Sequence, residues 1–156
     1  MISAIVAVDS NWGIGANGDL LEHIPEDLKR FKAITTGNIV VMGRKTWDSL
    51  PKKPLPDRNN LIITTNPIGK TIESNYQFVD MDAAKEIILT DVITNVFVIG
   101  GGTIYEELLP LCDRVYVTKI YKEHNNVDTY FPNLDDMEEW TPAISSQIFE
   151  YKDFTY

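Results

Sequence analysis

Short runs of consecutive apolar residues alternate along the chain with more polar, helix-like segments. The runs lie at Ile2–Val8, Ile39–Met42, Leu61–Thr65, Val96–Ile99 and Arg114–Tyr121, and several are rich in β-branched residues, which favours strands. Most are continuous rather than alternating, so both faces of these strands are expected to be buried. This pattern predicts a mostly parallel sheet covered by helices, in which ligands bind beyond the carboxyl ends of the strands.

The first helix is predicted to begin at Pro25, because proline suits the first helical position and acids suit the first turn. Glu26 and Asp27 follow directly. Gly37 is expected to end this helix. Its predicted apolar face comprises Leu28, Phe31 and Ile34.

Three further helices and two less regular segments complete the prediction. A short helix starts at residues 43–46, a second covers Asp82–Leu89 with Asp82 as its N-cap, and a third covers Thr103–Leu109. Residues 9–24 contain many glycines and asparagines and are expected to form a long loop. The segment from Ile144 onwards is expected to add one or two strands.

Composition narrows the class of protein. The chain has 156 residues, 44% of them hydrophobic, which suits one domain over residues 1–156. Its net charge of −9 argues against binding to nucleic acid or to an anionic membrane, but permits a local basic pocket for a small anion. A single cysteine excludes an internal disulfide and a zinc cluster, and no metal site is predicted. With no long apolar run, no signal peptide and no apolar seam, we expect a cytoplasmic monomer.

Two glycine-rich motifs differ in their context. Residues 13–18 match the dinucleotide fingerprint G-x-G-x-x-G, but no helix is expected before Pro25. This motif is therefore interpreted as a mobile loop. Gly100–Gly102 instead follow a strand directly and precede a helix, so their backbone is suited to binding a phosphate.

A second anion site is predicted where the next helix begins. Arg44, Lys45 and Thr46 follow a strand directly, and Thr64 and Thr65 end the neighbouring one. Two cations and a hydroxyl at a helix start suit a phosphate monoester. Two separate phosphate sites indicate a dinucleotide with a 2′-phosphate, that is, NADP.

Asp27 is the candidate acid of the site. It borders the apolar face of the first helix, where a carboxylate can hold an amidine-like ligand through paired hydrogen bonds. The alternative is that Asp27 only stabilises the helix N-terminus through the helix dipole.

Seven stretches match, in order and at near-constant spacing, those of one enzyme family. They are Ile2–Asp9, Gly13–Gly15, Ile24–Leu28 with Phe31, Val41–Trp47, Pro54–Pro56 with Arg58–Asn60, Ile99–Gly102 with Tyr105, and Asp128–Thr129 with Phe131–Pro132. On these stretches the chain resembles bacterial dihydrofolate reductase from end to end. The resemblance implies a single α/β domain with a mostly parallel central sheet flanked by helices, and an antiparallel C-terminal strand.

The resemblance also implies a substrate site for dihydrofolate. Asp27 would bind the 2-amino group and N3 of the pterin, with Thr118 supporting it as the second catalytic residue. Arg58 would bind the carboxylate of the glutamate tail. The substrate pocket would be completed by Ile5, Ala7, Leu28, Phe31, Leu50 and Ile99.

The implied cofactor is NADPH. Arg44, Lys45, Thr46 and Thr65 would hold its adenosine-phosphate half, and Tyr105 would lie near the nicotinamide. The residues that would face the pyrophosphate are Gly101, Gly102 and Thr103. Further cofactor contacts would come from Ala7, Ile14, Gly43, Thr64 and Ile104.

The implied activity is reduction of 7,8-dihydrofolate to tetrahydrofolate, a step of one-carbon metabolism that antifolates target. Hydride would pass from the nicotinamide to pterin C6. A water would protonate N5, because Asp27 would sit at the other edge of the ring. The protein would supply juxtaposition of two planar rings and exclusion of bulk water.

The sequence departs from the family in the predicted mobile loop. Leu21 and Glu22 stand where many members have Pro-Trp. Either Glu22 points to solvent, the preferred interpretation, or it binds a water near the pterin. Trp12 either covers the nicotinamide or packs the loop.

Other departures lie later in the chain. Val127 replaces a common glycine ahead of Asp128, the acid expected to contact the mobile loop, and predicts a stiffer loop. His23 and His124 have no visible partners and are interpreted as surface or loop residues. The family closes with two paired strands, whereas here the second would only begin at Phe154–Tyr156, so the closing strand is expected to be short.

Two alternative functions remain open at this stage. A pyrimidine reductase of the riboflavin pathway would use the same cofactor residues, but has no need of Arg58 for a glutamate tail. A non-catalytic nucleotide-binding module would have no use for Asp27 beside Phe31.

Overall fold

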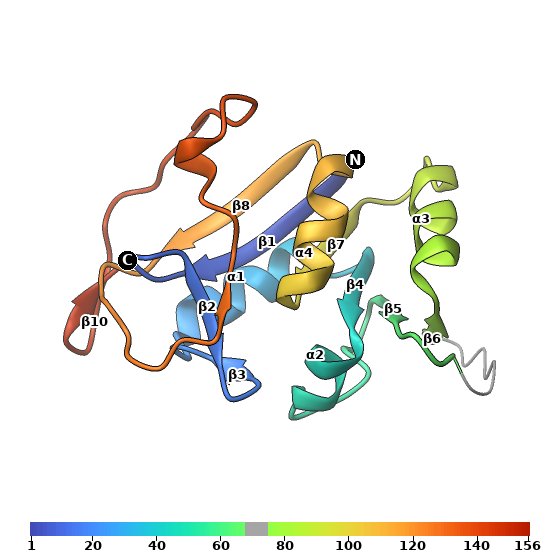
Figure 1. Cartoon of the computed structure of the whole chain (residues 1–156), viewed down its shortest axis with the longest axis horizontal. Coiled ribbons are helices and arrows are strands. Elements are labelled where there is room, and N and C mark those ends of the chain that lie inside the picture. The colour runs from blue at the N-terminus through green and yellow to red at the C-terminus, as the bar shows by residue number, and fades with distance from the viewer. Residues whose placement is uncertain (68–74) are drawn as a thin grey trace.

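A computed structural model describes residues 1–67 and 75–156 of the chain (Figure 1). Its centre is a six-stranded sheet in which every pair of neighbours is parallel. The strands, in spatial order, are β6 (Tyr76–Val79), β5 (Asn59–Ile63), β4 (Ile39–Gly43), β7 (Val96–Gly100), β1 (Ile2–Val8) and β8 (Arg114–Lys119). The predicted parallel sheet is therefore confirmed.

Helices cover both faces of this sheet. One face packs against α3 (Met81–Thr90) and α4 (Gly102–Leu108), and the other against α1 (Pro25–Thr35) and α2 (Arg44–Ser49). In Figure 1, α4 lies in front of the sheet and α1 behind it. Successive residues of β4 point to opposite faces of the sheet. Val41 packs on the side of α3 and α4, whereas Val40 and Met42 pack on the side of α1 and α2. Two single-turn 3₁₀ helices, Leu109–Leu111 and Leu134–Asp136, lie between the later elements.

Several predicted element boundaries are wrong by one or two residues, including the end of the strand predicted at Arg114–Tyr121, which ends at Lys119 as β8. The strand predicted at Leu61–Thr65 is β5, which begins and ends two residues earlier, so Thr64 and Thr65 follow it. The helix predicted from Asp82 begins at Met81, and its N-cap is Asp80, whose carboxylate accepts a 2.8 Å hydrogen bond from the Ala83 N–H. Asp80 can cap because its backbone is extended, whereas Asp82 already lies in the first helical turn. The short strand β6 had no predicted counterpart.

The segment 9–24 is more ordered than the predicted long loop. It contains β2 (Gly13–Ala16) and β3 (Asp19–Leu20), which join β9 (Thr129–Tyr130) in a small antiparallel sheet. The fingerprint-like glycines therefore lie in a strand and its turn, and precede no helix, as expected. Because these strands have two to four residues, they carry no hydrophobic period that sequence analysis can detect.

The C-terminal strands form a hairpin apart from the main sheet. They are β10 (Glu150–Tyr151) and β11 (Phe154–Thr155), which pair in antiparallel fashion. The prediction of a strand from Ile144 is wrong, because residues 144–149 have no strand structure. The hairpin is anchored by the Tyr121 N–H, which donates to the Thr155 carbonyl at 2.9 Å, and by Phe154, which packs with Ile24 and Ile120. In the part of the chain that the structure describes, no helix is long and apolar enough to cross a membrane.

Candidate active site

Asp27 and Thr118 meet at the carboxyl end of the sheet. Asp27 lies in the first turn of α1, which starts after the buried residue Ile24. Thr118 lies near the end of β8, opposite Ala7 of β1. The Thr118 hydroxyl donates to Asp27 Oδ1 at 2.6 Å, and the half-buried carboxylate keeps its second oxygen for a ligand. The structure thus brings together the two residues that the resemblance pairs.

Most of the apolar side chains predicted to line the substrate pocket, here called the apolar wall, lie on one face of the sheet. Ile5, Phe31, Leu50 and Ile99 belong to the same cluster of packed side chains. Ala7 packs instead with the cluster around Ile24, below the C-terminal hairpin.

One residue of the predicted helix face differs from expectation. The Leu28 side chain is 42% exposed and belongs to none of the core clusters, so the prediction that it turns inward with Phe31 is wrong for the free chain. Leu28 follows Asp27 directly and so lies at the edge of the site rather than in the core.

Arg58 lies at the other end of α1. It is 95% buried (5% exposed), and its Nε donates to the Pro56 carbonyl at 2.8 Å. Its Nη1 donates to Thr35 Oγ1 at 3.2 Å, and its guanidinium lies 5.9 Å from the centre of the Phe31 ring. Burial lowers the pKa of Arg58, partly offset by the charge of Asp57, but arginine remains a cation at any physiological pH.

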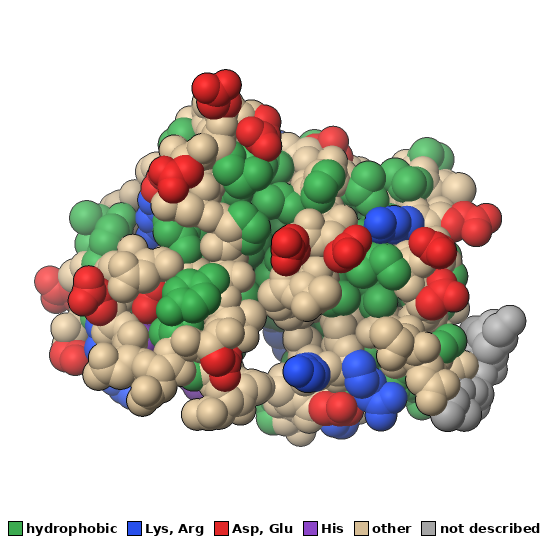
Figure 2. All heavy atoms as spheres, in the orientation of Figure 1, with side chains coloured by type: hydrophobic (Ala, Val, Ile, Leu, Met, Phe, Trp, Pro, Cys, Tyr) green, Lys and Arg blue, Asp and Glu red, His purple; other side chains and the backbone are tan. Residues whose placement is uncertain are grey.

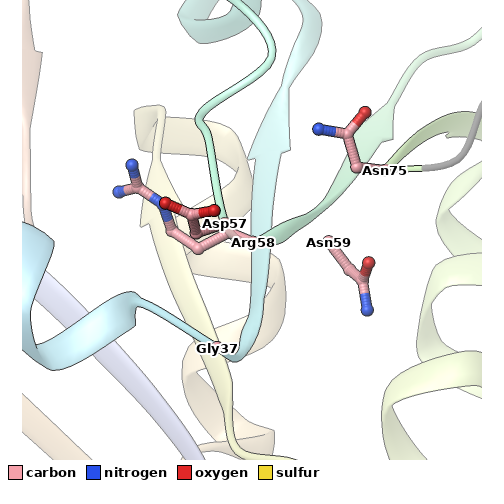
Figure 3. A pocket seen from close by; sticks show the side chains of 5 residues that line it. All are labelled: Gly37, Asp57, Arg58, Asn59 and Asn75. Atoms are coloured by element: carbon pink, nitrogen blue, oxygen red, sulfur yellow. The ribbon is translucent and has the colours of Figure 1, made fainter.

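A pocket of about 390 Å³ lies beside Arg58, at the amino ends of β5 and β6. It is lined by Gly37, Asp57, Arg58, Asn59 and Asn75 (Figure 3). Figure 3 shows the guanidinium directed away from Asn59, and the hydrogen bond to Thr35 places it beside α1. The charged end of Arg58 is therefore turned towards the helix rather than towards the asparagines of the pocket.

The two charged groups define the length of the site. Thr35, the partner of Arg58, lies eight residues after Asp27 on the same helix, which corresponds to about 12 Å along the helix axis. An anion-binding group and a cation-binding group at this separation, joined by the apolar side chain of Phe31, suit an elongated ligand with a polar ring at one end and a carboxylate at the other.

Two helix N-termini lie side by side at the carboxyl ends of β4 and β7. These strands are neighbours, and α2 and α4 start immediately beyond them. Both N-caps, Gly43 and Gly101, have no side chain with which to cap, and neither first turn contains an acid. The first N–H groups of these two fully described helices therefore remain available to an anion, and a dinucleotide phosphate fits this environment.

Glycine is needed for the close approach at Gly43 and for the backbone conformation at Gly100, whereas a Cβ atom on Gly101 would make an ordinary van der Waals contact. A Cβ atom on Gly43 would lie 2.9 Å from Ile104 Cγ1, and Cβ atoms on Gly100 and Gly101 would lie 3.4 and 3.5 Å from Thr46 Oγ1. Gly100 also has a φ of 133°, which L side chains rarely adopt. The two predicted phosphate sites are thus adjacent.

Basic side chains surround this region. Arg44 and Lys45 are exposed, and Arg44 Nε lies 3.2 Å from Asp48 Oδ1. Figure 2 shows basic groups gathered over α2, beside a hollow that separates α2 from β2 and β3, on a face that otherwise carries many acids. Thr64 and Thr65 follow β5 at the same edge of the sheet.

The remaining predicted cofactor residues differ in exposure. Thr103 is exposed in the first turn of α4, whereas Ile14 and Ile104 are buried in the core. Tyr105 is also buried, and its hydroxyl donates to the Ile5 carbonyl at 2.7 Å. Burial strongly raises the pKa of the Tyr105 hydroxyl, so this group stays neutral.

The β2–β3 segment is held against the loop that precedes β9. The Asn17 N–H donates to Asp128 Oδ2 at 2.8 Å, and the Asp128 N–H donates to the Gly15 carbonyl at 3.1 Å. The first of these bonds lowers the pKa of Asp128. The side chain of Val127 packs against Gly13, where a Cβ atom would lie 2.8 Å from Val127 Cγ1.

Trp12 packs the base of this segment. It is 8% exposed and stacks on Phe131, with ring centres 6.3 Å apart. Of the two predicted roles for Trp12, packing of the loop is the one that this arrangement supports.

Glu22 contradicts its preferred interpretation, and His124, although it lies in a loop as expected, has the partners that the sequence did not show. Glu22 does not point to solvent: its Oε1 lies 2.9 Å from His124 Nε2 and 3.3 Å from Lys122 Nζ. His124 is partly buried, and its Nδ1 lies 3.2 Å from Asp9 Oδ2. His23, by contrast, is exposed as expected and lies 3.2 Å from Asp19. The three-residue cluster carries no sequence signal, because its members lie 13 to more than 100 residues apart.

Tyr156 is a further residue that sequence reasoning did not connect with the site. It packs with the cluster around Ile24 and Phe154. Burial, followed by the negative charges of Asp27 and Glu26, raises the pKa of its hydroxyl.

Comparisons with known proteins agree with this geometry. The family model described as "Dihydrofolate reductase" matches residues 1–154. The dihydrofolate reductase of Bacillus subtilis is 39% identical over 150 residues, which cover 94% of this chain and 84% of the relative. The type 3 dihydrofolate reductase of Salmonella typhimurium is 41% identical over 133 residues, covering 85% and 79% of the two chains, and that of Buchnera aphidicola is 35% identical over 156 residues, covering 99% and 93%. The chain therefore belongs to the dihydrofolate reductase family.

Proposed function

We propose that this chain reduces 7,8-dihydrofolate to 5,6,7,8-tetrahydrofolate with NADPH as its cofactor. The observation that carries the proposal is the pair of charged groups at the two ends of α1: the Asp27 carboxylate held by Thr118 at one end, and Arg58, from the turn before β5, bonded to Thr35 at the other. Membership of the dihydrofolate reductase family supports both the activity and the cofactor. We further propose that residues 1–156 act as one domain, as a cytoplasmic monomer that binds neither nucleic acid nor membranes.

The substrate is proposed to lie along α1. The Asp27 carboxylate would accept paired hydrogen bonds from the 2-amino group and N3 of the pterin, while Thr118 donates to Oδ1, which has a second acceptor site. The ring would be enclosed by Ile5, Ala7, Leu28, Phe31, Leu50 and Ile99. The guanidinium of Arg58 would bind the glutamate carboxylate, for which its planar fork is well suited.

The cofactor is proposed to lie across the carboxyl ends of β4 and β7. Arg44, Lys45, Thr46, Thr64 and Thr65 would hold the adenosine-phosphate half. Gly101, Gly102 and Thr103 would face the pyrophosphate. Ala7, Ile14, Gly43, Ile104 and Tyr105 would complete the cofactor site, where Tyr105 acts through the Ile5 backbone that its hydroxyl holds.

In the reaction, reduced nicotinamide supplies the hydride that pterin C6 accepts. The protein contributes the remaining conditions: Asp27 orients and polarises the pterin, and the apolar wall excludes bulk water. A water donates the proton to N5, because the Asp27 carboxylate would occupy the opposite edge of the ring. The β2–β3 segment, held by Asp128, would cover the reacting rings.

The two alternative functions account less well for these observations. A pyrimidine reductase of the riboflavin pathway would leave Arg58 without a carboxylate to bind. A non-catalytic nucleotide-binding module would leave the Asp27–Thr118 pair without a role. The family match supports neither alternative.

The test compares the wild type with Asp27→Asn in the same assay, the loss of NADPH absorbance with dihydrofolate. We expect activity in the wild type and a fall in kcat/KM of at least about a hundredfold in the variant, because asparagine keeps the shape but loses the charge. NADPH affinity is the control and should be unchanged. A wild type that binds NADPH but does not oxidise it with dihydrofolate would point to another reductase substrate.

A further inference from the structure

A histidine beside the active site is held between two acids. His124 lies in the loop between β8 and β9; its Nδ1 is 3.2 Å from Asp9 Oδ2, and its Nε2 is 2.9 Å from Glu22 Oε1. The side chains of His124, Asp9 and Glu22 are only 12%, 1% and 16% exposed. None of the three has a role in the function proposed above.

The hydrogen bonds at Asp9 decide which ring nitrogen must carry a proton. Asp9 Oδ1 accepts from the backbone N–H groups of Asn11 and Gly13 at 2.9 and 2.8 Å. Oδ2 accepts from the backbone N–H of His124 at 3.2 Å. A carboxylate surrounded by donors acts as an ionised acceptor. The fourth contact must therefore be a hydrogen bond that a protonated His124 Nδ1 donates to Asp9 Oδ2.

The second acid then requires a second proton on the ring. If only Nδ1 were protonated, the lone pair of Nε2 would face the Glu22 carboxylate at 2.9 Å. Burial opposes ionisation of Glu22, but hydrogen bonds from His124 and Lys122 outweigh it and lower the pKa of Glu22. Only the doubly protonated imidazolium form of His124 can therefore donate to Asp9 and to Glu22 at the same time.

Other charges complete the surroundings of the ring. Lys122, two residues before His124, lies 3.3 Å from Glu22 Oε1 and 3.4 Å from Asp153, in the turn between β10 and β11. The network therefore joins the end of β1, the β2–β3 segment, the β8–β9 loop and the C-terminal hairpin.

The network fixes the segment that carries the substrate-binding acid. Glu22 lies five residues before Asp27, and the buried N-cap Ile24 stands between them. Thr118 holds Asp27, and His124, six residues later in the chain, holds Glu22. The segment from Glu22 to Asp27 is therefore held at two points, by Thr118 of β8 and by His124 in the loop that follows β8.

We infer that His124, in its doubly protonated form, is a positioning residue that holds Glu22 and thereby sets Asp27 for dihydrofolate binding. This inference rests on the proposed function. Its consequence is that dihydrofolate binding weakens when a rise in pH removes the second ring proton of His124. The loss of one hydrogen bond to a charged group is expected to raise KM for dihydrofolate about three- to tenfold, with a smaller effect on kcat.

Three variants separate this positioning role from general effects of pH. His124→Asn can still donate to Asp9 but cannot reach Glu22, so KM should be high at every pH. Glu22→Gln can donate its amide to the unprotonated Nε2 and accept from the protonated one, so KM should stay low and lose its pH dependence. His23→Asn removes the only other histidine, which is exposed, and should keep the wild-type profile.

The experiment measures KM and kcat for dihydrofolate between about pH 5.5 and about pH 8.5 for the wild type and the three variants. Melting temperatures are recorded alongside; if His124→Asn fails to fold, the comparison of Glu22→Gln with the wild type still decides. Histidine ¹⁵N NMR provides a readout without turnover. In His23→Asn only His124 is observed, and both of its ring nitrogens should carry protons at about pH 6.

The outcomes are distinct. A wild-type profile retained in both His124→Asn and Glu22→Gln, or a His124 ring with a single proton at about pH 6, would overturn the positioning role while leaving the reductase activity intact. A wild type that reduces no dihydrofolate at any pH would overturn the proposed function, and this inference with it.

Discussion

The Thr118 hydroxyl lies 2.6 Å from Asp27 Oδ1, although 91 positions separate the two residues in the chain. β8 lies beside β1 at the edge of the sheet, and α1 begins over the carboxyl end of β1, so the topology brings strand and helix together. A hydrogen bond to an ionised group is both short and directional. It holds one carboxylate oxygen and leaves the other to meet the pterin.

Thr118→Val should weaken dihydrofolate binding, because valine has the shape of threonine but donates no hydrogen bond. We expect kcat/KM for dihydrofolate to fall about ten- to hundredfold, mainly through KM. Steady-state kinetics with NADPH would measure this change. Thr118→Ser, which restores the hydroxyl, should recover most of the activity, and equal losses in both variants would contradict the role of the hydroxyl.

Lys45→Gln should reduce affinity for NADPH but not for NADH. Lys45 is exposed in the first turn of α2, and its charge is proposed to contact the 2′-phosphate that NADH lacks. The loss of one charge-assisted contact should raise the NADPH dissociation constant about tenfold. Fluorescence titration with both cofactors would measure it. Lys85→Gln on α3 serves as the control of equal charge; an equal loss for NADPH and NADH would show that Lys45 does not read the phosphate.

Arg58→Lys should weaken binding of the glutamate tail of the substrate but not binding of the pterin. Lysine keeps the charge but loses the fork that Arg58 directs at Pro56, Thr35 and the proposed glutamate carboxylate. KM for dihydrofolate should rise about tenfold, whereas KM for a dihydropterin without a glutamate tail should not change. If both substrates are affected equally, the effect comes from packing against Phe31 rather than from carboxylate binding. The melting temperature of the variant monitors that packing.

Glu22 should stabilise the fold above its titration range and not below it. Hydrogen bonds from His124 and Lys122 lower the pKa of Glu22 in the folded chain from its ordinary value of 4.5. A lowered pKa in the folded state means that the stabilisation is present above pH 4.5 and is lost as the pH falls through the folded value. The melting temperature of the wild type should therefore exceed that of Glu22→Gln above pH 4.5 while His124 is doubly protonated, and the difference should shrink in acid.

Thermal unfolding of both proteins across this pH range would measure the effect. Glu86→Gln, at an exposed position of α3, is the matched control and should show no such pH-dependent difference. A wild-type advantage that persists unchanged below pH 4.5 would mean that the charge of Glu22 is not what stabilises the fold.

The sequence by itself determined the sheet and its ligand edge. Continuous apolar runs predicted parallel strands buried on both faces, and parallel strands end at a common edge. The first turns of α2 and α4 therefore had to lie at this edge, and the pairing of β4 with β7 brings them side by side. Pro25 likewise fixed the start of α1 and placed Asp27 in its first turn. These signals are local, because periodicity and capping act within a few residues.

The tertiary structure alone decided the contacts between distant segments. Nothing near Glu22 or His124 in the sequence indicates that they pair, and the expectations that Glu22 points to solvent and that His124 has no partner were wrong. The short strand β2 was missed for the same reason, since its partner β9 lies more than 100 residues away. Such pairs depend on which strands become neighbours in the sheet, and that choice is made by the burial of the whole core rather than by any local pattern.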